Sequence, residues 1–436
     1  FVLYQPEIET MSREDLEALQ LKRLKDLVKR VSESIPFYKE SFAKAGLSAD
    51  DITCLEDLAK FPFTTKQDMR NAYPFEMFAV PKSEVARIHC SSGTTGTATV
   101  VGYTQADLDR WGDCFARFLY AANCGKEATI QVAYGYGLFT GGLGAHYGGE
   151  RAGCTVLPMS TGNTKRQVRL MHDFEVDALC CTPSYALNIA DVAIEEGFDP
   201  AKDFKIHAAV LGAEPCSEAM RSEIQEKLGV QVFDIYGLSE IMGPGVACEC
   251  EMQHGLHVCE DQFIIEIVDP ETLQPVPDGQ WGEVVFTTLC KDCSPLIRYR
   301  TRDISRIIPG ECSCGRTFRR MDRITGRTDD MMILRGVNVF PSQIEEEIVS
   351  FPEITAQYQL ILTTKGTLDH VELLVETVPD FPFDEVRRLE KLKRDLEKAL
   401  KDNLQIAVDV KIVEPKTLER SEGKAKRIVD LREGLH

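Results

Sequence analysis

Apolar and polar residues alternate along this chain in a pattern typical of strands and helices that follow one another. From residue 14 to about residue 45, apolar side chains recur at helical spacing, which predicts an N-terminal helical layer. Short β-rich runs, separated by amphipathic stretches, then follow at 129–133, 155–157, 178–181, 208–211 and 230–235. This order predicts parallel strands covered by helices, and therefore an α/β fold.

The pattern changes twice in the second half of the chain. Past Phe263 the apolar runs resemble hairpins, with Pro277, Asp278 and Gly279 standing between two of them. Near Gly326 the composition shifts again, and the remainder has the pattern of a small α+β domain. We expect a large N-terminal domain over 1–326, with mostly parallel sheets and a β-rich subdomain at about 245–326. A C-terminal domain is expected over 330–436, with the boundary near 327–330.

Length and charge narrow the classes of function. A chain of 436 residues is too long for one compact core. Fifty Lys and Arg residues against 69 Asp and Glu residues give a net charge of −19, which argues against nucleic acid or an anionic membrane as the main partner. We expect neither a transmembrane helix nor a leader peptide. Fifteen cysteines, an odd number, favour reduced thiols in the cytoplasm.

The segment RIHCSSGTTGTATVVGYT, residues 87–104, is rich in glycine and hydroxyl side chains. Glycine lets a backbone approach closely, so the N–H groups and hydroxyls of such a loop can surround phosphate oxygens. The segment lacks the Gly-Lys-Ser/Thr ending of a Walker loop. On its own it fits a polar hairpin as well as a nucleotide loop.

Further polar motifs follow apolar runs in a fixed order: GAEP at 212–215, DIYGLSE at 234–240, RTRD at 300–303, GRTDD at 326–330 and RSEGK at 420–424. With the SSGTTG loop, this series resembles the adenylate-forming superfamily of acyl-CoA synthetases and luciferases. Stretches such as FPFTTKQDMR, YGLSEIMGPGVACEC and RGVNVFPSQIEEEI extend the resemblance to the phenylacetate–CoA ligases, over nearly the whole chain.

The resemblance implies a Mg²⁺-dependent ligase that joins an aromatic acid, phenylacetate first of all, to AMP and then to coenzyme A. Lys424 corresponds to the family's adenylation lysine, which stabilises negative charge on the α-phosphate. Without the resemblance, Lys424 beside Lys426 and Arg427 fits a solvated basic tail. The same resemblance implies that the C-terminal domain is mobile and that Asp329 is the hinge.

Most of the remaining site residues are expected to bind ATP or its metal. The resemblance gives this role to Ser91, Ser92, Gly93, Thr94, Thr95, Gly96, Gly212, Ala213, Glu214, Pro215, Asp234, Ile235, Tyr236, Gly237, Asp303 and Arg327. Asp303 would accept hydrogen bonds from the ribose hydroxyls, with an ion pair to Arg300 or Arg302 as the alternative. Glu240 would coordinate Mg²⁺, with a helix cap as the alternative. Thr97 stands where many relatives carry lysine, which weakens the expectation of a strong pyrophosphate clamp.

The acyl group and coenzyme A are expected at neighbouring positions. Tyr136 and Phe139 stand in a glycine-rich frame at 133–149, and with Gly212, Ala213 and Tyr236 they favour an aromatic acid over a long fatty chain. A packed aromatic cluster is the alternative. The residues implied for coenzyme A lie after the hinge: Arg335, Gly336 and Val337, with Asn338 and Val339 near the pantetheine. A homodimer is expected by analogy alone.

Cysteine and histidine spacing supports a separate hypothesis. Cys250, His257, Cys312 and Cys314 are the preferred ligands of one tetrahedral Zn²⁺, which would have a structural role because four protein ligands leave no open position. Cys248, His254, Cys259, Cys290 and Cys293 compete as ligands. Plain reduced thiols are the alternative.

Two other functions fit the same motifs. An adenylating transferase would load the acyl group onto the thiol of a carrier protein. A nucleotide-binding or zinc-stapled scaffold would bind ATP without releasing pyrophosphate.

Overall fold

The N-terminal helices of the computed structural model form the predicted layer. The model describes residues 2–91, 98–328, 332–334, 337–365, 368–404, 406–421 and 425–432. Ser12 caps helix α2 (Arg13–Ser34) by accepting a hydrogen bond from the Asp15 N–H. The helix ends because Ile35 precedes Pro36, which begins α3 (Pro36–Ala45). The apolar face of α2 packs into the main core.

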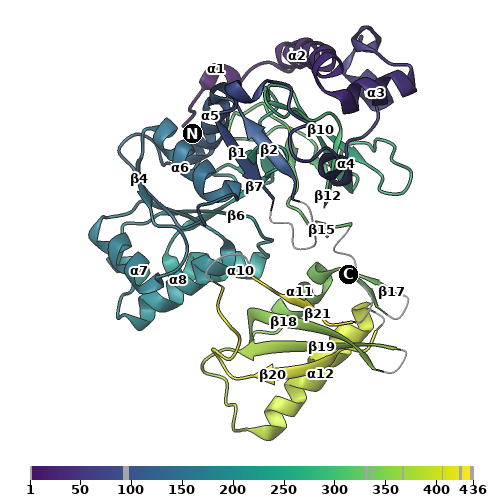
Figure 1. The fold of residues 1–436 in the computed structure, drawn as a ribbon. Coiled ribbons are helices and arrows are strands. Elements are labelled where there is room, and N and C mark those ends of the chain that lie inside the picture. The colour runs from purple at the N-terminus through teal and green to yellow at the C-terminus, as the bar shows by residue number, and fades with distance from the viewer. Residues whose placement is uncertain are drawn as a thin grey trace.

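A nine-stranded sheet forms the centre of the molecule (Figure 1), in the order β13-β14-β9-β8-β7-β6-β5-β3-β4. The five strands that the sequence predicted are parallel to one another: β3 (Thr129–Val132), β4 (Thr155–Pro158), β5 (Ala178–Cys181), β6 (Ala208–Gly212) and β7 (Gln231–Leu238). Neighbouring residues of one strand enter different cores, as Ala208 and Ala209 do. Helices therefore cover both faces of the sheet.

Each face of the sheet has its own set of helices. Residues of α5 (Gln105–Ala121) and α6 (Thr140–Ala152) belong to the core that also contains Ala208. Residues of α7 (Thr164–Asp173), α8 (Pro183–Glu195) and α10 (Glu218–Leu228) belong to the core that contains Ala209. Shorter helices connect these elements: α1 (Pro6–Glu9), η1 (Ala49–Asp51), η2 (Leu55–Lys60), α4 (Lys66–Asn71), η3 (Lys82–Glu84) and α9 (Pro200–Asp203).

The predicted β-rich subdomain is divided between two sheets. Four strands extend the central sheet in antiparallel fashion: β8 (Gly243–Glu249), β9 (Leu256–Val258), β13 (Ile307–Ile308) and β14 (Arg320–Met321). A separate antiparallel sheet contains β10 (Phe263–Val268), β11 (Gly282–Thr288), β12 (Tyr299–Ser305) and β15 (Gly326–Arg327). The predicted hairpin around Asp278 is confirmed, because β10 pairs with β11. Strands β1 (Arg87–Cys90) and β2 (Val100–Tyr103) form a two-stranded sheet.

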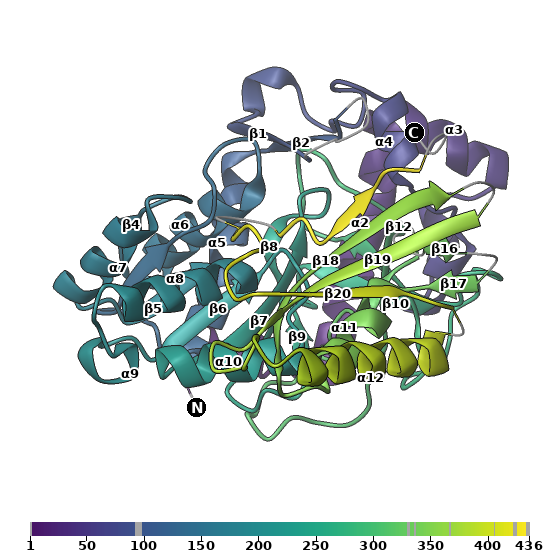
Figure 2. The same cartoon turned by 90° about the horizontal axis from the view of Figure 1, so that it is seen from below.

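The C-terminal part has a core of its own. Its sheet has the order β20-β19-β18-β21, from β18 (Ile354–Lys365), β19 (Leu368–Thr377), β20 (Asp409–Val413) and β21 (Ile428–Asp430). The hairpin β16 (Met332–Leu334) and β17 (Val337–Val339) and the helices α11 (Pro341–Val349) and α12 (Val386–Leu404) complete it. In Figures 1 and 2 this part, coloured green to yellow, forms a body beside α10. Among the described residues, no helix combines the length and the apolar character needed to span a membrane.

Candidate active site

Three of the predicted nucleotide-binding side chains meet where two sheets come together. The Tyr236 hydroxyl, from the end of β7, donates a hydrogen bond of 2.6 Å to Asp303 Oδ2. Arg327 Nη1 donates to Asp303 Oδ1 at 3.1 Å, because the β12–β15 register sets these residues opposite each other. The ring of Tyr236 stacks on Phe286 of β11 at 6.0 Å between centroids. Burial and the Asp303 charge raise the pKa of Tyr236, so its hydroxyl remains a donor.

The alternative ion pair for Asp303 is wrong. Along β12 the buried residues alternate with half-buried ones, so Asp303 faces the interior while Arg300 and Arg302 face the other side. Arg300 forms a bidentate ion pair with Glu283, at 2.7 and 3.0 Å, and Arg302 lies 3.8 Å from the same carboxylate. The Asp303 carboxylate is thus directed toward Tyr236 and Arg327.

The GAEP and DIYG motifs lie side by side because Gly212 pairs with Ile235 across β6 and β7. A Cβ at Gly212 would lie 2.4 Å from the Ile235 carbonyl oxygen, which explains the glycine. Ala213 follows with a positive φ of 71°, a backbone conformation that is rare for residues other than glycine and is common at functional sites. Pro215 is exposed beside it.

The DIYG motif contains a second glycine with a steric role. A Cβ at Gly237 would lie 1.8 Å from the Gly243 carbonyl oxygen, where β7 and β8 pair with a shifted register. The Asp234 N–H donates to Glu249 at 2.8 Å. Burial and the Glu249 charge raise the pKa of Asp234 to about 7.

Both ends of the predicted phosphate loop are next to Glu240. Ser91 and Thr99 join the ends through their hydroxyls and through a Ser91 N–H bond of 3.1 Å to the Thr99 carbonyl oxygen. Thr99 Oγ1 donates to Glu240 Oε1 at 3.3 Å. Residues Ser92, Gly93, Thr94, Thr95, Gly96 and Thr97 lie outside the described residues. Glu240 stands in the turn between β7 and β8, so the helix-cap alternative is wrong.

Sequence reasoning missed two lysines at Glu240. Lys66, the first residue of α4, lies 3.3 Å from Glu240 Oε1. Lys291 is buried, and its ammonium donates to the carbonyl oxygens of Glu240 at 3.3 Å and Ile241 at 2.8 Å, 4.6 Å from the centre of the Tyr103 ring. Lys66 stands within the FPFTTKQDMR stretch. That stretch contributes to the family resemblance, but the resemblance assigns no role to its lysine. Nothing local to Lys291 signals its burial.

The predicted acyl-binding residues lie around the start of α6. The Tyr136 hydroxyl is 3.2 Å from His146 Nδ1, and Phe139 precedes the helix with 40% of its side chain exposed. This exposure does not fit a closed aromatic cluster. The Leu138 carbonyl oxygen accepts from His89 Nδ1 at 2.9 Å and from the Cys90 N–H at 3.1 Å. The segment predicted to bind the acyl group is therefore held against β1, the strand that leads into the predicted phosphate loop.

The C-terminal predictions are placed only in part. Val337 is partly buried against the C-terminal core. Asp329, Arg335, Gly336 and Lys424 lie outside the described residues. Ala425, the neighbour of Lys424, is described, and its N–H donates to Glu214 Oε2 at 2.8 Å.

The preferred cysteine and histidine set comes together at one point. One ligand atom from each of Cys250, His257, Cys312 and Cys314 lies within 4.8 Å of the others. The pairing of β9 with β14 brings the 312–314 loop over His257. His257 Nδ1 is 3.1 Å from the Phe318 carbonyl oxygen, and Nε2 faces Cys314 Sγ at 3.4 Å.

The chemistry of these donors suits a zinc ion. Hydrogen bonds from Cys250 and His257 hold the pKa of the Cys314 thiol well below its usual range, which favours the thiolate that binds metal. Because the Phe318 carbonyl oxygen accepts from Nδ1, Nε2 of His257 is left as the ligand atom, as is usual for histidines that bind metal. The competing His254 lies 3.1 Å from Arg320 Nη1 instead.

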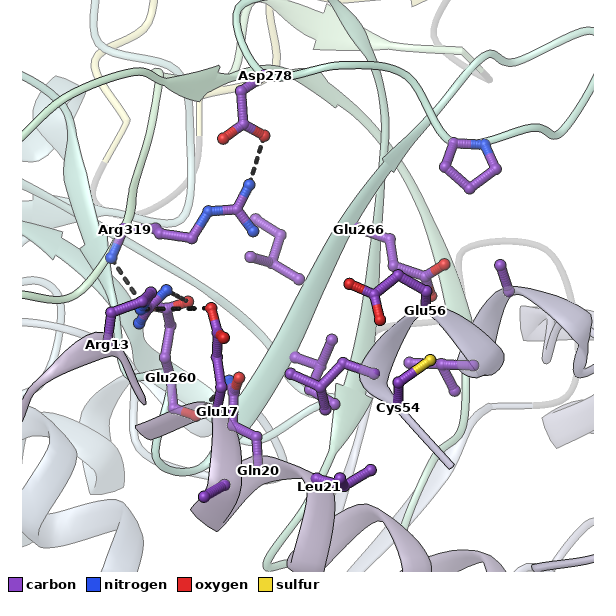
Figure 3. Close-up of a pocket in the computed structure, with 17 residues that line it drawn as sticks. Arg13, Glu17, Gln20, Leu21, Cys54, Glu56, Glu260, Glu266, Asp278 and Arg319 are labelled. Carbon is purple, nitrogen blue, oxygen red and sulfur yellow. Dashed lines mark hydrogen bonds and ion pairs between the residues drawn. The ribbon is translucent and has the colours of Figure 1, made fainter. Parts of the chain in front are cut away.

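One cavity of the molecule lies apart from this site. About 770 Å³ in volume, it lies between α2, η2 and β10, and it is lined by residues such as Arg13, Glu260 and Glu266 (Figure 3). Glu260 already pairs with Arg13 at 2.8 Å, and Glu266 pairs with Arg298 at 2.9 Å. None of the predicted site residues that the structure describes lines it.

Comparisons with known proteins show the family to which the chain belongs. The family model of AMP-binding enzymes matches residues 8–289, and that of the AMP-binding enzyme C-terminal domain matches residues 336–432. The phenylacetate-coenzyme A ligase of Escherichia coli (strain K12) is 50% identical over 98% of this chain and 97% of its own. The phenylacetate-coenzyme A ligase of Pseudomonas putida is 49% identical over 98% and 96%.

One solved protein matches the structure in two states. 2-Hydroxyisobutyryl-CoA ligase in the postadenylation state, in complex with R3-HIB-AMP, has a TM-score of 0.90 at 27% identity, covering 98% of this chain and 91% of the other. The same ligase with 2-HIB-AMP and CoA in the thioesterification state has a TM-score of 0.72 at 28% identity, covering 98% and 92%. The chain belongs to the family of AMP-binding enzymes, and it activates a carboxylic acid with ATP and forms its coenzyme A thioester.

Proposed function

We propose that the acid is phenylacetate or a close aromatic relative, and that AMP and pyrophosphate are the other products. The observation that carries this proposal is the identity of about half of the residues, over nearly the whole chain, to ligases named for phenylacetate. Tyr136 and the half-exposed ring of Phe139 support it, because a flat apolar wall suits an aromatic acid.

The proposed roles in nucleotide binding follow from the contacts of Asp303, from the pairing of β6 with β7, and from the contacts between Ser91 and Thr99. Asp303 accepts the ribose hydroxyls, held by Tyr236 and Arg327. Residues 212–215 and 234–237 surround the adenine and the acyl ring. Ser91 and the loop after it bind the phosphates.

The metal and the positive charge of this site are also proposals. Glu240 is the proposed protein ligand of Mg²⁺, since this ion prefers hard oxygen ligands, and the bound ion would offset negative charge on the phosphates. Lys66 brings a positive charge to the same carboxylate.

Two domains with a hinge are the proposed organisation: an N-terminal domain over 1–326, a hinge near 327–330 at Asp329 and a mobile lid over 330–436. Separate cores on the two sides support it. The higher similarity to the postadenylation state supports an adenylating arrangement here, with Lys424 next to Ala425 as the adenylation lysine. Arg335, Gly336 and Val337 would then contact coenzyme A after rotation.

A panel of acids tests the substrate. Pyrophosphate release is measured for phenylacetate, benzoate, acetate and hexanoate, with and without coenzyme A. We expect phenylacetate to give the highest kcat/KM and coenzyme A to consume the adenylate. Turnover with acetate but not with phenylacetate would contradict the proposed substrate, and an adenylate that free coenzyme A does not consume would favour a carrier-protein thiol.

We also propose that Cys250, His257, Cys312 and Cys314 hold a structural zinc ion. Its expected role is to tie the 312–314 loop to β9, with no part in the chemistry. Metal analysis should find about one zinc per chain, and Cys312→Ser should lose it while Cys54→Ser, at an exposed cysteine, should keep it. Metal-free protein with an unchanged melting temperature would contradict the proposal.

The cellular location and the oligomeric state are also proposals. All fifteen cysteines are free thiols in the structure, which supports a reducing, cytoplasmic location. The homodimer rests on analogy.

A further inference from the structure

The Glu214 carboxylate connects the two parts of the molecule. Its Oε1 accepts from the Ser184 N–H at 2.6 Å, and its Oε2 accepts from the Ala425 N–H at 2.8 Å. Ser184 lies in the first turn of α8, where backbone N–H groups point outward and the helix dipole favours a negative charge. One oxygen is therefore anchored on the N-terminal part, and the other holds the C-terminal part.

Other contacts cross the same boundary with less effect. Lys416 and Glu195 form an ion pair, but both side chains are largely exposed, so water and salt screen it. Arg427 reaches the Met220 sulfur at 3.7 Å, a weak acceptor. A hydrogen bond between an N–H and a carboxylate is shorter and about twice as strong as one between neutral groups. The contact between Glu214 and Ala425 is accordingly the strongest polar contact among these three.

The hydrogen bond between Glu214 and Ala425 lies next to the proposed adenylation lysine in the chain. Ala425 follows directly after Lys424 in the chain, so a carboxylate that holds the Ala425 amide restricts where the lysine can reach. The structure resembles the postadenylation state of 2-hydroxyisobutyryl-CoA ligase more than its thioesterification state. A different placement of the C-terminal domain would separate Ala425 from Glu214, while the bond to Ser184 lies within the N-terminal part and would remain.

We propose that Glu214 is a positioning residue that holds the C-terminal domain in the adenylating arrangement through the Ala425 amide. This inference rests on the proposed role of Lys424 and on the proposed rotation of the lid. Because the Ser184 amide keeps the carboxylate in place, the same acceptor is ready each time the domain returns. The residue thereby favours the first half-reaction over the second.

The two half-reactions are measured separately in the full-length enzyme. Pyrophosphate release with ATP and phenylacetate reports adenylation, and thioester formation from supplied phenylacetyl-adenylate and coenzyme A reports the second step. Glu214→Ala should slow adenylation about ten- to a hundredfold, which is the effect of losing a hydrogen bond to a charged group. Because the Glu214 side chain is partly exposed, we expect a value toward the lower end. Thioester formation should stay within about threefold of the parent rate or increase.

Two variants and one structural readout complete the test. Glu214→Gln keeps an acceptor oxygen without the charge and should fall between the parent and Glu214→Ala. Lys416→Met removes the exposed ion pair and should leave both half-reactions unchanged. Fluorescence energy transfer between a label on α7 and one on α12 should show a lower population of the adenylating arrangement in Glu214→Ala.

Three results would overturn the proposal. They are equal losses in both half-reactions, an unchanged adenylation rate, and a loss explained fully by weaker ATP binding at equilibrium. If the parent enzyme releases no pyrophosphate with any acid, the proposed function fails instead. The energy-transfer readout still tests Glu214 in that case, because an unchanged domain arrangement in Glu214→Ala refutes the positioning role.

Discussion

Replacing Tyr236 by phenylalanine removes one hydroxyl and leaves the ring that stacks on Phe286. The lost bond is 2.6 Å long and has a buried carboxylate, Asp303, as its acceptor. Hydrogen bonds to charged groups contribute about 1.5–3 kcal/mol. Since Arg327 still donates to the other carboxylate oxygen, we expect a loss in the lower half of this range, about 1.5–2 kcal/mol.

If Asp303 binds the ribose, this loss reaches the nucleotide. A weakening of about 1.5–2 kcal/mol corresponds to about a 10- to 30-fold fall in kcat/KM for ATP. Most of it should be a higher KM for ATP, while the KM for the acid changes little. Initial rates of pyrophosphate release over a range of ATP concentrations, at saturating acid, measure the effect.

Tyr38→Phe is the matched control. The Tyr38 hydroxyl is also buried, but its partners, the Thr64 hydroxyl at 2.9 Å and the Ile297 N–H at 3.0 Å, are neutral. This variant should lower the melting temperature and leave the KM for ATP unchanged. A Tyr236→Phe enzyme with the parent's KM for ATP would refute the assignment of Asp303 to the ribose.

Three further predictions concern stability. Gly237→Ala should destabilise the fold by about 1–3 kcal/mol in urea unfolding, because its Cβ would lie 1.8 Å from a main-chain oxygen of β8; Gly135→Ala, with open space around it, should cost little and serves as the control. Burial raises the pKa of Asp234 to about 7, so stability should fall as pH rises from about 4 to about 7. Asp234→Asn should gain melting temperature relative to the parent at pH 8 more than at pH 5, and equal differences would contradict this. Arg117→Leu leaves the Asp261 carboxylate buried without its bidentate partner at 2.6 and 2.9 Å, and should cost about 3–5 kcal/mol, whereas a loss under 1 kcal/mol would be a contradiction.

Strands were predictable where local pattern alone decides them. Strands β5 and β6 are buried along their whole length and appear as short apolar runs, as at 178–181, whereas β4, at the edge of the sheet, is partly exposed. Strands β13 and β14, of two residues each, have no such pattern, and their membership of the central sheet depends on partners distant in sequence. The sequence therefore predicted a β-rich region but not the division of its strands between two sheets.

The site could be predicted as a set of residue types but not as a set of contacts. Motif residues such as Asp303 and Glu240 were recognisable because each stands in a distinctive short stretch. Their partners come from elsewhere: Lys66 reaches Glu240 across more than half of the N-terminal domain's sequence. A buried lysine such as Lys291 has the same local composition as a solvated one, and only the tertiary fold distinguishes them.

The negative charge of the chain bears on how it attracts its substrates. A chain with a net charge of −19 must bind ATP and coenzyme A, both polyanions, so their attraction has to be local. In the proposed nucleotide site two described cations lie against carboxylates, Lys66 against Glu240 and Arg327 against Asp303, whereas the buried Lys291 donates to main-chain carbonyl oxygens. These pairs lower the cost of holding charges in a partly buried site while no nucleotide is bound. If Mg²⁺ binds Glu240 and the ribose binds Asp303, as proposed, Lys66 and Arg327 would lose these partners and could turn to the phosphates, so substrate binding would itself redirect positive charge toward the reacting groups.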